Sequence, residues 1–290
     1  MKKNIVTLGL LLICIAIYGQ NKPSNLSFDT LDSLIFSAYN QGDFNSALNY
    51  AQIAQNKAVK ERGNQDSIYL DHTVNLAFIY IELGELSLAE KKLLEVEKTI
   101  IKTKGKNNQS FASSLAYLAD FYNEVGDYTQ AEAYYLVSTQ LNSKLSGKKS
   151  DDYAKSISGL GNLYYNLGDF KKAEPLYIEA KAIYAKNQGK ESNQYGRMLN
   201  DLALINLSSG NYTQAESLIK EAMGISKKLD KATNYNNYLI QLNNLASLYT
   251  EMGKMEEAEK ALLKTLALKA EKSGKENSSY ANSLNNLAAF

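Results

Sequence analysis

The sequence predicts an all-α protein, a right-handed α-solenoid of helical hairpins. Three regularities support this fold class. Glycine returns at intervals of 42, 42, 42, 42 and 43 residues, an alanine follows each of these glycines five residues later, and a glutamate follows each of the last five alanines. Such a period is typical of repeat proteins, in which each copy buries its apolar face against its neighbours. The repeated glycines are Gly42, Gly84, Gly126, Gly168, Gly210 and Gly253.

The first 20 residues precede the repeats and have the layout of a secretory signal peptide. Lys2 and Lys3 give a positive start, and residues 5–18 are almost entirely apolar. A membrane span needs about 20 apolar residues, and this run has 14. We therefore expect export to the periplasm or the extracellular space, with a retained membrane anchor as the alternative. A short linker, residues 21–26, follows.

The single cysteine, Cys14, lies inside this apolar run. Ile13 precedes it, whereas a lipidated cysteine follows a small residue, so we do not expect lipidation. If the segment is removed, the mature chain has no cysteine and therefore no disulfide.

Each copy is predicted to contain a helix, a tight turn, a second helix and a looser turn. In the fourth copy Ile157, Leu160 and Tyr164 fall on one helix face. Gly168 ends that helix, because the sharp turn needs a left-handed backbone that glycine adopts without steric cost, and Asp169 caps the next helix. The approximate copies are 27–67, 68–110, 111–152, 153–194, 195–237, 238–279 and a partial seventh, 280–290. We expect a fragment cut inside a repeat, with a true terminus and a short closing helix as the alternative.

Other local signals recur with the same period. Asp127 and Asn211 each precede a glutamine by three residues, which is the spacing of a capping box. In the second to seventh copies one position of the first helix has a small residue, which predicts a close approach of two helices that a leucine would overpack. These small residues are Ala77, Ala119, Gly161, Ala203, Ala246 and Ala288.

Several segments resemble a known repeat family. SLNNLA at 283–288, QLNNLASLY at 241–249, LGDFKKAEPLY at 167–177 and GKE at 189–191 are similar to the tetratricopeptide repeat, in the longer version seen in kinesin light chains and many bacterial proteins. The resemblance covers residues 27–290. It implies a concave face lined by the first helices and used for peptide binding. In secreted bacterial proteins of this kind, such arrays often precede a CHAT-type caspase-like peptidase domain or a membrane-spanning signalling kinase.

The sequence offers little for catalysis or metal binding. His72 is the only histidine, and a metal site would want at least two His or Cys ligands. We expect His72 to be a solvent-facing or groove-facing helix residue. The repeated glutamates are spread one per copy, which indicates a scaffold. We therefore predict no enzyme, no cofactor and no metal, and the net charge of +1 with mixed signs argues against nucleic acid as a partner.

Polar residues of the first helices are the candidate binding residues. Asparagine offers both donors and acceptors, which suits a peptide backbone, and the resemblance implies that the asparagines of the LNNLA segments look inward. The alternative is that some are polar surface or inter-helix bonds. The candidates are Asn75, Lys155, Asn162, Arg197, Asn200, Asn243, Asn244, Asn285 and Asn286, and by phase Tyr117, Asp120 and Asp201 face the same side.

These observations predict a non-catalytic scaffold that binds a protein or peptide in its concave groove, with no membrane span in the mature chain. The alternative is the sensing part of a larger protein whose effector domain lies beyond residue 290.

Overall fold

The computed structural model describes residues 25–229, 231–274 and 278–290. These residues form thirteen α-helices in sequential hairpins, which confirms the predicted all-α solenoid. The predicted signal peptide, residues 1–20, and most of the predicted linker lie outside the described residues. The chain divides into two compact units, residues 1–99 and 100–290, and helix α5 contains the boundary.

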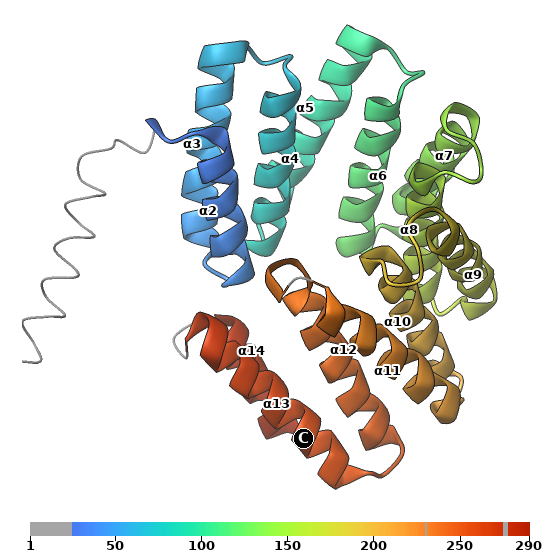
Figure 1. Cartoon of the computed structure of the whole chain (residues 1–290). Helices are drawn as coiled ribbons and strands as arrows, with labels where there is room; N and C mark the ends of the chain where they lie inside the picture. The colour runs from blue at the N-terminus through green and yellow to red at the C-terminus, as the bar shows by residue number, and fades with distance from the viewer. Residues whose placement is uncertain (1–24, 230, 275–277) are drawn as a thin grey trace, which may run out of the picture. The chain divides into compact units, whose positions relative to one another are not determined.

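The first unit contains two hairpins (Figure 1). Its helix α3 packs against both α2 and α4, and the alanines of α3 lie against Leu31 and Ile35 of α2 and Leu76 of α4. The small alanine side chains let these helices approach closely. The helices are α2 (Phe28–Asn40), α3 (Phe44–Arg62), α4 (Ser67–Glu82) and α5 (Leu86–Lys104), which crosses the boundary.

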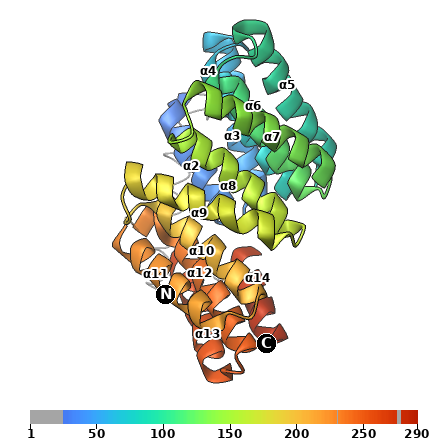
Figure 2. The ribbon, with the colours of Figure 1, turned by 90° about the vertical axis from the view of Figure 1, so that its right-hand side faces the viewer.

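The second unit continues the same pattern, and Figures 1 and 2 show its hairpins in succession. Each helix packs against the next, and the first helices of neighbouring copies also meet, α6 with α8 and α10 with α12. The helices are α6 (Gln109–Glu124), α7 (Tyr128–Leu145), α8 (Asp151–Asn166), α9 (Phe170–Asn187), α10 (Asn193–Ser208), α11 (Tyr212–Lys228), α12 (Lys231–Glu251), α13 (Met255–Ser273) and α14 (Ser278–Ala289).

The repeated glycines occupy the tight turns between paired helices. All six have positive φ, between 70° and 82°. At Gly168 the backbone N–H groups of the turn satisfy the carbonyls at the end of α8: Gly168 donates to Tyr165 at 2.9 Å and Asp169 to Tyr164 at 2.8 Å. The Asp169 carboxylate then accepts from the Lys172 backbone N–H at 3.2 Å and caps α9.

The two predicted capping boxes differ. The Asp127 carboxylate accepts from the backbone N–H of Gln130 at 3.1 Å, as its spacing indicates. Asn211 makes no side-chain cap hydrogen bond, so that prediction is wrong. Its backbone carbonyl still accepts from Ala215, so α11 begins at the expected place without the side-chain contribution.

Two of the repeated glutamates, Glu132 and Glu216, join one copy to the next through tyrosine hydroxyls. Tyr164 donates to Glu132 at 2.7 Å, and Tyr249 donates to Glu216 at 3.0 Å. Burial and the Glu132 carboxylate raise the pKa of Tyr164 to about 12, so this hydroxyl remains a donor at neutral pH. At these two positions the repeated glutamate therefore has a structural role.

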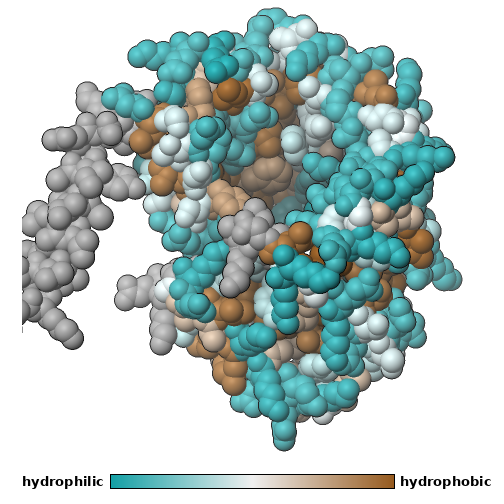
Figure 3. All heavy atoms as spheres, in the orientation of Figure 1, coloured by the Kyte–Doolittle hydropathy of each residue, from teal (hydrophilic) through white to brown (hydrophobic). Residues whose placement is uncertain are grey.

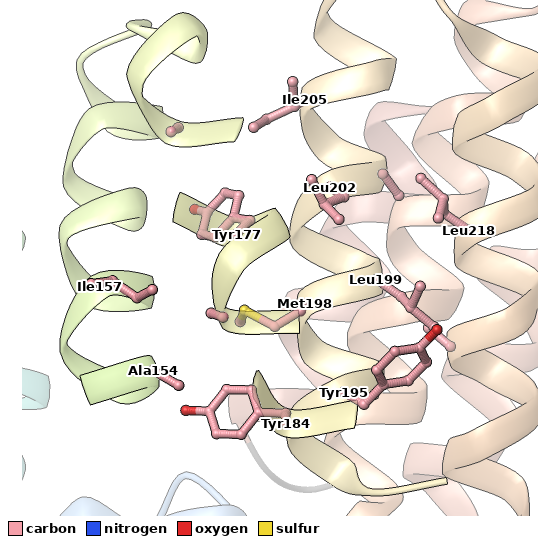
Figure 4. Packing of buried hydrophobic residues seen from close by; sticks show 14 of the residues in the cluster. Ala154, Ile157, Tyr177, Tyr184, Tyr195, Met198, Leu199, Leu202, Ile205 and Leu218 are labelled. Carbon is pink, nitrogen blue, oxygen red and sulfur yellow. The ribbon is translucent and has the colours of Figure 1, made fainter. Parts of the chain in front are cut away.

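The core of the second unit runs between successive helices (Figure 4). Tyr177 and Tyr184 of α9 lie between α8 and α10 in this view, and Met198 of α10 packs beside them. Tyr177 is only 2% exposed. A tyrosine ring buries a large apolar area and carries a polar hydroxyl. The hydroxyl of Tyr177 connects the core with the polar surface of the unit.

Candidate functional site

A polar groove lies along helices α6, α8, α9 and α10 of the second unit. It has a volume of about 420 Å³, and we call it the α6–α10 groove. Three of the candidate residues, Lys155, Asn162 and Arg197, line it together. The complete lining is Asp120, Asp151, Asp152, Lys155, Ser158, Gly159, Asn162, Tyr184, Gln188, Gln194, Arg197 and Met198.

The two cations of the groove, Lys155 and Arg197, interact electrostatically with the carboxylate of Asp120. Asp120 of α6 is reached by water but has protein on most sides, and this desolvation raises its pKa, while the hydroxyl of Tyr135, Lys155 and Arg197 oppose the rise. Lys155 also lies over the ring of Tyr117, with its Nζ 5.9 Å from the ring centroid. Because the Lys155 and Arg197 side chains are exposed, their donors remain accessible to a ligand.

A second carboxylate, Asp201, lies one turn along α10 from Arg197. Burial raises the pKa of Asp201 from 3.8 to about 6, and Arg197 and the Asn200 side chain oppose this effect. Arg197 therefore interacts electrostatically with both Asp120 and Asp201. This concentration of opposite charges in a partly enclosed groove favours ligands that present both donors and acceptors.

Two tyrosines of the second helices reach this polar layer through gaps left by glycine. The Tyr135 hydroxyl, from α7, donates to the Asp120 carboxylate, and the Tyr177 hydroxyl, from α9, donates to Asn162 at 2.7 Å. A Cβ atom added at Gly159 would lie 2.6 Å from the Tyr135 ring. A Cβ at Gly161 would lie 2.7 Å from the Tyr177 ring.

The contacts of Tyr135 and Tyr177 with the groove were not predicted from the sequence. A signal was present, because α8 has glycine at two interior positions where a helix prefers other residues. The rings need that space, and the hydroxyls then hold Asp120 and Asn162 in place.

The asparagine candidates divide by what they contact. Asn200 is 7% exposed, and its side-chain oxygen accepts from the Asn244 amide at 2.8 Å. This bond joins α10 to α12, which agrees with the alternative expectation that some of these asparagines form hydrogen bonds between helices. Asn243 is half-buried, whereas Asn285 and Asn286 are exposed on α14.

One candidate lies in the first unit. Asn75 of α4 is half-buried and lines a separate groove of about 590 Å³, together with His72. His72 is 2% exposed. Residues of α2 pack over its ring, so the expectation of a solvent-facing histidine is wrong. His72 lines a groove, which agrees with the alternative of a groove-facing residue.

Within the described ranges, no group of three or more His, Cys, Asp or Glu side chains has the arrangement of a metal site. In the same ranges, no helix combines the length and the hydropathy needed to cross a membrane.

This chain matches models of one repeat family and resembles several solved structures. A model of the tetratricopeptide repeat matches residues 110–186 and 152–228, and a second model with that description matches residues 239–278. No curated protein gives a match. The structure of BtubC (BKLC) from P. vanneervenii has a TM-score of 0.61 at 19% identity, and the alignment covers 84% of this chain and 92% of that one.

Two other solved structures are similar. A putative kinesin light chain from Podosopora anserina, with nearly identical TPR-like repeats, has a TM-score of 0.53 at 22% identity and covers 70% of this chain and 95% of its own. A Rap protein complexed with Competence and Sporulation Factor has a TM-score of 0.63 at 16% identity, with coverage of 95% and 78%. At these identities the likeness concerns the fold.

Proposed function

Because this chain belongs to the tetratricopeptide-repeat family, we propose that it is a non-catalytic scaffold that binds a peptide segment of a protein partner in the α6–α10 groove. The observation that carries the proposal is the convergence of Lys155, Asn162 and Arg197 on one groove beside the enclosed carboxylate of Asp120. Tetratricopeptide arrays are interaction domains, and the Rap protein of similar fold has a factor bound to it.

A peptide suits this groove better than a uniformly charged ligand. The lining has both carboxylates and cations, together with the amides of Asn162, Gln188 and Gln194. A peptide backbone presents a donor and an acceptor at each residue, which such a lining can satisfy. A polyanion would be repelled by the carboxylates, and a polycation by Lys155 and Arg197.

The absence of turnover is part of the proposal. The only histidine, His72, lies in the other unit, and the only cysteine is Cys14 near the N-terminus. The charged groups of the groove interact with one another, and such pairing serves binding rather than the activation of a nucleophile.

We also propose that the protein works outside the cytoplasm. Lys2 and Lys3 followed by a 14-residue apolar run support export. Fractionation of cells expressing the full chain, with N-terminal sequencing of the mature protein, tests this. Full-length protein in the cytoplasm would contradict it.

The binding proposal is tested by selecting peptides from a displayed library on the full chain and measuring their affinities by calorimetry. We expect the double variant Lys155→Ala, Arg197→Ala to weaken selected peptides at least about tenfold, because it removes two charge-assisted donors. Lys171→Ala, an exposed lysine on the outer side of α9, is the matched control. Equal affinities for the wild type and the double variant would refute the groove assignment.

A second pair of variants tests the asparagines. Asn243→Ala with Asn244→Ala removes the bond between Asn244 and Asn200, and we expect weaker peptide binding without unfolding of the array. Unchanged affinity would leave these asparagines with a structural role only.

A further inference from the structure

The first unit contains a groove that differs in chemistry from the α6–α10 groove. It lies between α2 and α4, and we call it the α2–α4 groove. Its walls are largely aromatic and aliphatic, and Phe36 exposes 56% of its surface beside it. Figure 3 shows apolar surface among hydrophilic surface over this part of the first unit. The lining is Phe28, Asp29, Asp32, Ile35, Phe36, Tyr39, Ile68, Asp71, His72, Asn75, Phe78 and Ile79.

The charged side chains that line this groove are carboxylates. Asp29 and Asp32 come from α2 and Asp71 from α4, and all three are exposed. Neither lysine nor arginine occurs among the described lining residues. Two cations of α3, Lys57 and Arg62, lie over the ring of Phe28. An apolar groove with an acidic edge is complementary to a cationic side chain that has an apolar neighbour.

His72 is independent evidence that this groove binds a ligand. Its side chain is buried, and neither ring nitrogen has a hydrogen-bond partner. Nδ1 lies 3.6 Å from Oδ1 of Asp32, and the ring stacks on Phe28 at a centroid distance of 5.6 Å. Buried polar atoms are normally paired, so an unpaired buried histidine on a groove wall is expected at a functional position.

We propose that the α2–α4 groove binds a peptide segment in which a lysine or arginine neighbours an apolar residue. The cation lies against the carboxylates of Asp29 and Asp32, and the apolar side chain packs on Phe36 and on the stacked pair of Phe28 and His72. This site goes beyond the function proposed above, because it belongs to the other unit and selects a different ligand.

The position of His72 makes this binding dependent on pH. Burial lowers the pKa of His72, while Asp32 and Asp71 oppose that effect, so the ring is neutral at pH 7. When the ring is protonated, it becomes a cation for Asp32 and competes with the cation of the ligand. The other charged groups on this side are Lys57 and Arg62 of α3, which lie over the ring of Phe28. Ligand affinity therefore falls as the pH drops below the ordinary pKa of histidine, 6.5.

The test uses the full chain and a fluorescein-labelled, capped peptide with the sequence Ala-Phe-Arg-Leu-Ala, followed by anisotropy. The control ligand has citrulline, a neutral analogue of the same shape, in place of arginine. We expect the arginine peptide to bind at least about tenfold more tightly at low salt. Asp29→Asn with Asp32→Asn should remove this preference, whereas Glu85→Gln, an exposed carboxylate of the same unit outside the groove, should preserve it.

Three outcomes would overturn the proposal. The first is equal affinity for the arginine and citrulline peptides. The second is an arginine preference that survives in the double aspartate variant. The third is a preference lost only in Lys155→Ala, Arg197→Ala, which would move the peptide to the α6–α10 groove and leave the function proposed above intact. Because citrulline changes only the ligand, the first comparison does not depend on how any variant folds.

The pH effect has its own variant. Because burial lowers the pKa of His72 below 6.5, we expect wild-type affinity to fall several-fold as the pH is lowered from about 7.5 to about 4.5. In His72→Phe the stacked ring remains and the titrating group is gone, so the affinity should change much less. An equal fall in both proteins would refute the competition between His72 and the ligand.

Discussion

Replacement of Asp201 by asparagine should stabilise the protein at neutral pH. Burial raises the pKa of Asp201 from 3.8 to about 6, so the folded state binds the carboxyl proton more tightly than the unfolded state does. At pH values above about 6 the ionised carboxylate therefore destabilises the folded state relative to the unfolded state. As the pH falls from about 6 towards 3.8, protonation of Asp201 removes this destabilisation. Asparagine has nearly the same shape and carries no charge.

The magnitude follows from the pKa. A change from 3.8 to about 6 corresponds to about 3 kcal/mol at pH 7. Asp201 is half-buried, and the exposed Arg197 beside it admits solvent, so screening reduces the gain that we expect for Asp201→Asn to about 1–2 kcal/mol. The gain should shrink steadily as the pH is lowered, because the wild-type carboxyl becomes protonated in the folded state.

Urea unfolding followed by circular dichroism, from about pH 8 to about pH 4, measures this difference. Midpoints of the transition are compared, since repeat arrays can unfold in parts. Asp152→Asn, an exposed carboxylate on the α6–α10 groove, is the control and should change stability by less than about 0.5 kcal/mol. A variant less stable than the wild type at neutral pH would show that the attraction between Asp201 and Arg197 outweighs desolvation.

Three glycines should respond to alanine in three ways, all measurable by the same urea transitions. Gly161→Ala should cost about 1–3 kcal/mol, because the new Cβ would lie 2.7 Å from the Tyr177 ring, although other copies have alanine at this position. Gly126→Ala should cost about 1–2 kcal/mol from its φ of +82° alone, since no atom lies within 4 Å. Gly224→Ala, exposed within α11 and without a neighbour, should stabilise by about 0.5–1 kcal/mol. Equal effects at Gly126 and Gly224 would contradict the role of φ, and a neutral Gly161→Ala would show that the Tyr177 ring moves aside.

The fold was predictable because its cause is local and repeated. A glycine such as Gly168 marks a turn by its backbone freedom alone, and the helix phase around Leu160 places the apolar face. Lys155 and Asn162 share a side of α8 because they are separated by about two helical turns, and both line one groove with Arg197 of α10.

The remainder depends on contacts between side chains of different helices, which no local pattern reveals. Tyr135 has the sequence context of a core residue, yet its hydroxyl donates to Asp120 from the preceding helix. His72 follows an exposed aspartate on a helix, yet the Phe28 ring from the preceding copy stacks on its ring and helps to bury it. Asn244 bonds Asn200 over a distance of 44 residues in the chain. Each pairing depends on which side chains two packed helices bring together.

The two grooves illustrate how one repeat supports different specificities. The turn glycines and the alanines of the helix contacts determine how hairpins pair, and none of these residues lines either groove. The first-helix positions that do line the grooves carry Asp32 and His72 in one unit, and Lys155 and Arg197 in the other. Because the stability of such an array is approximately a sum over repeats and their interfaces, these positions can change their chemistry while the hairpins keep their packing. An acidic, aromatic groove and a groove of mixed charge can therefore occur in one scaffold, each with its own ligand.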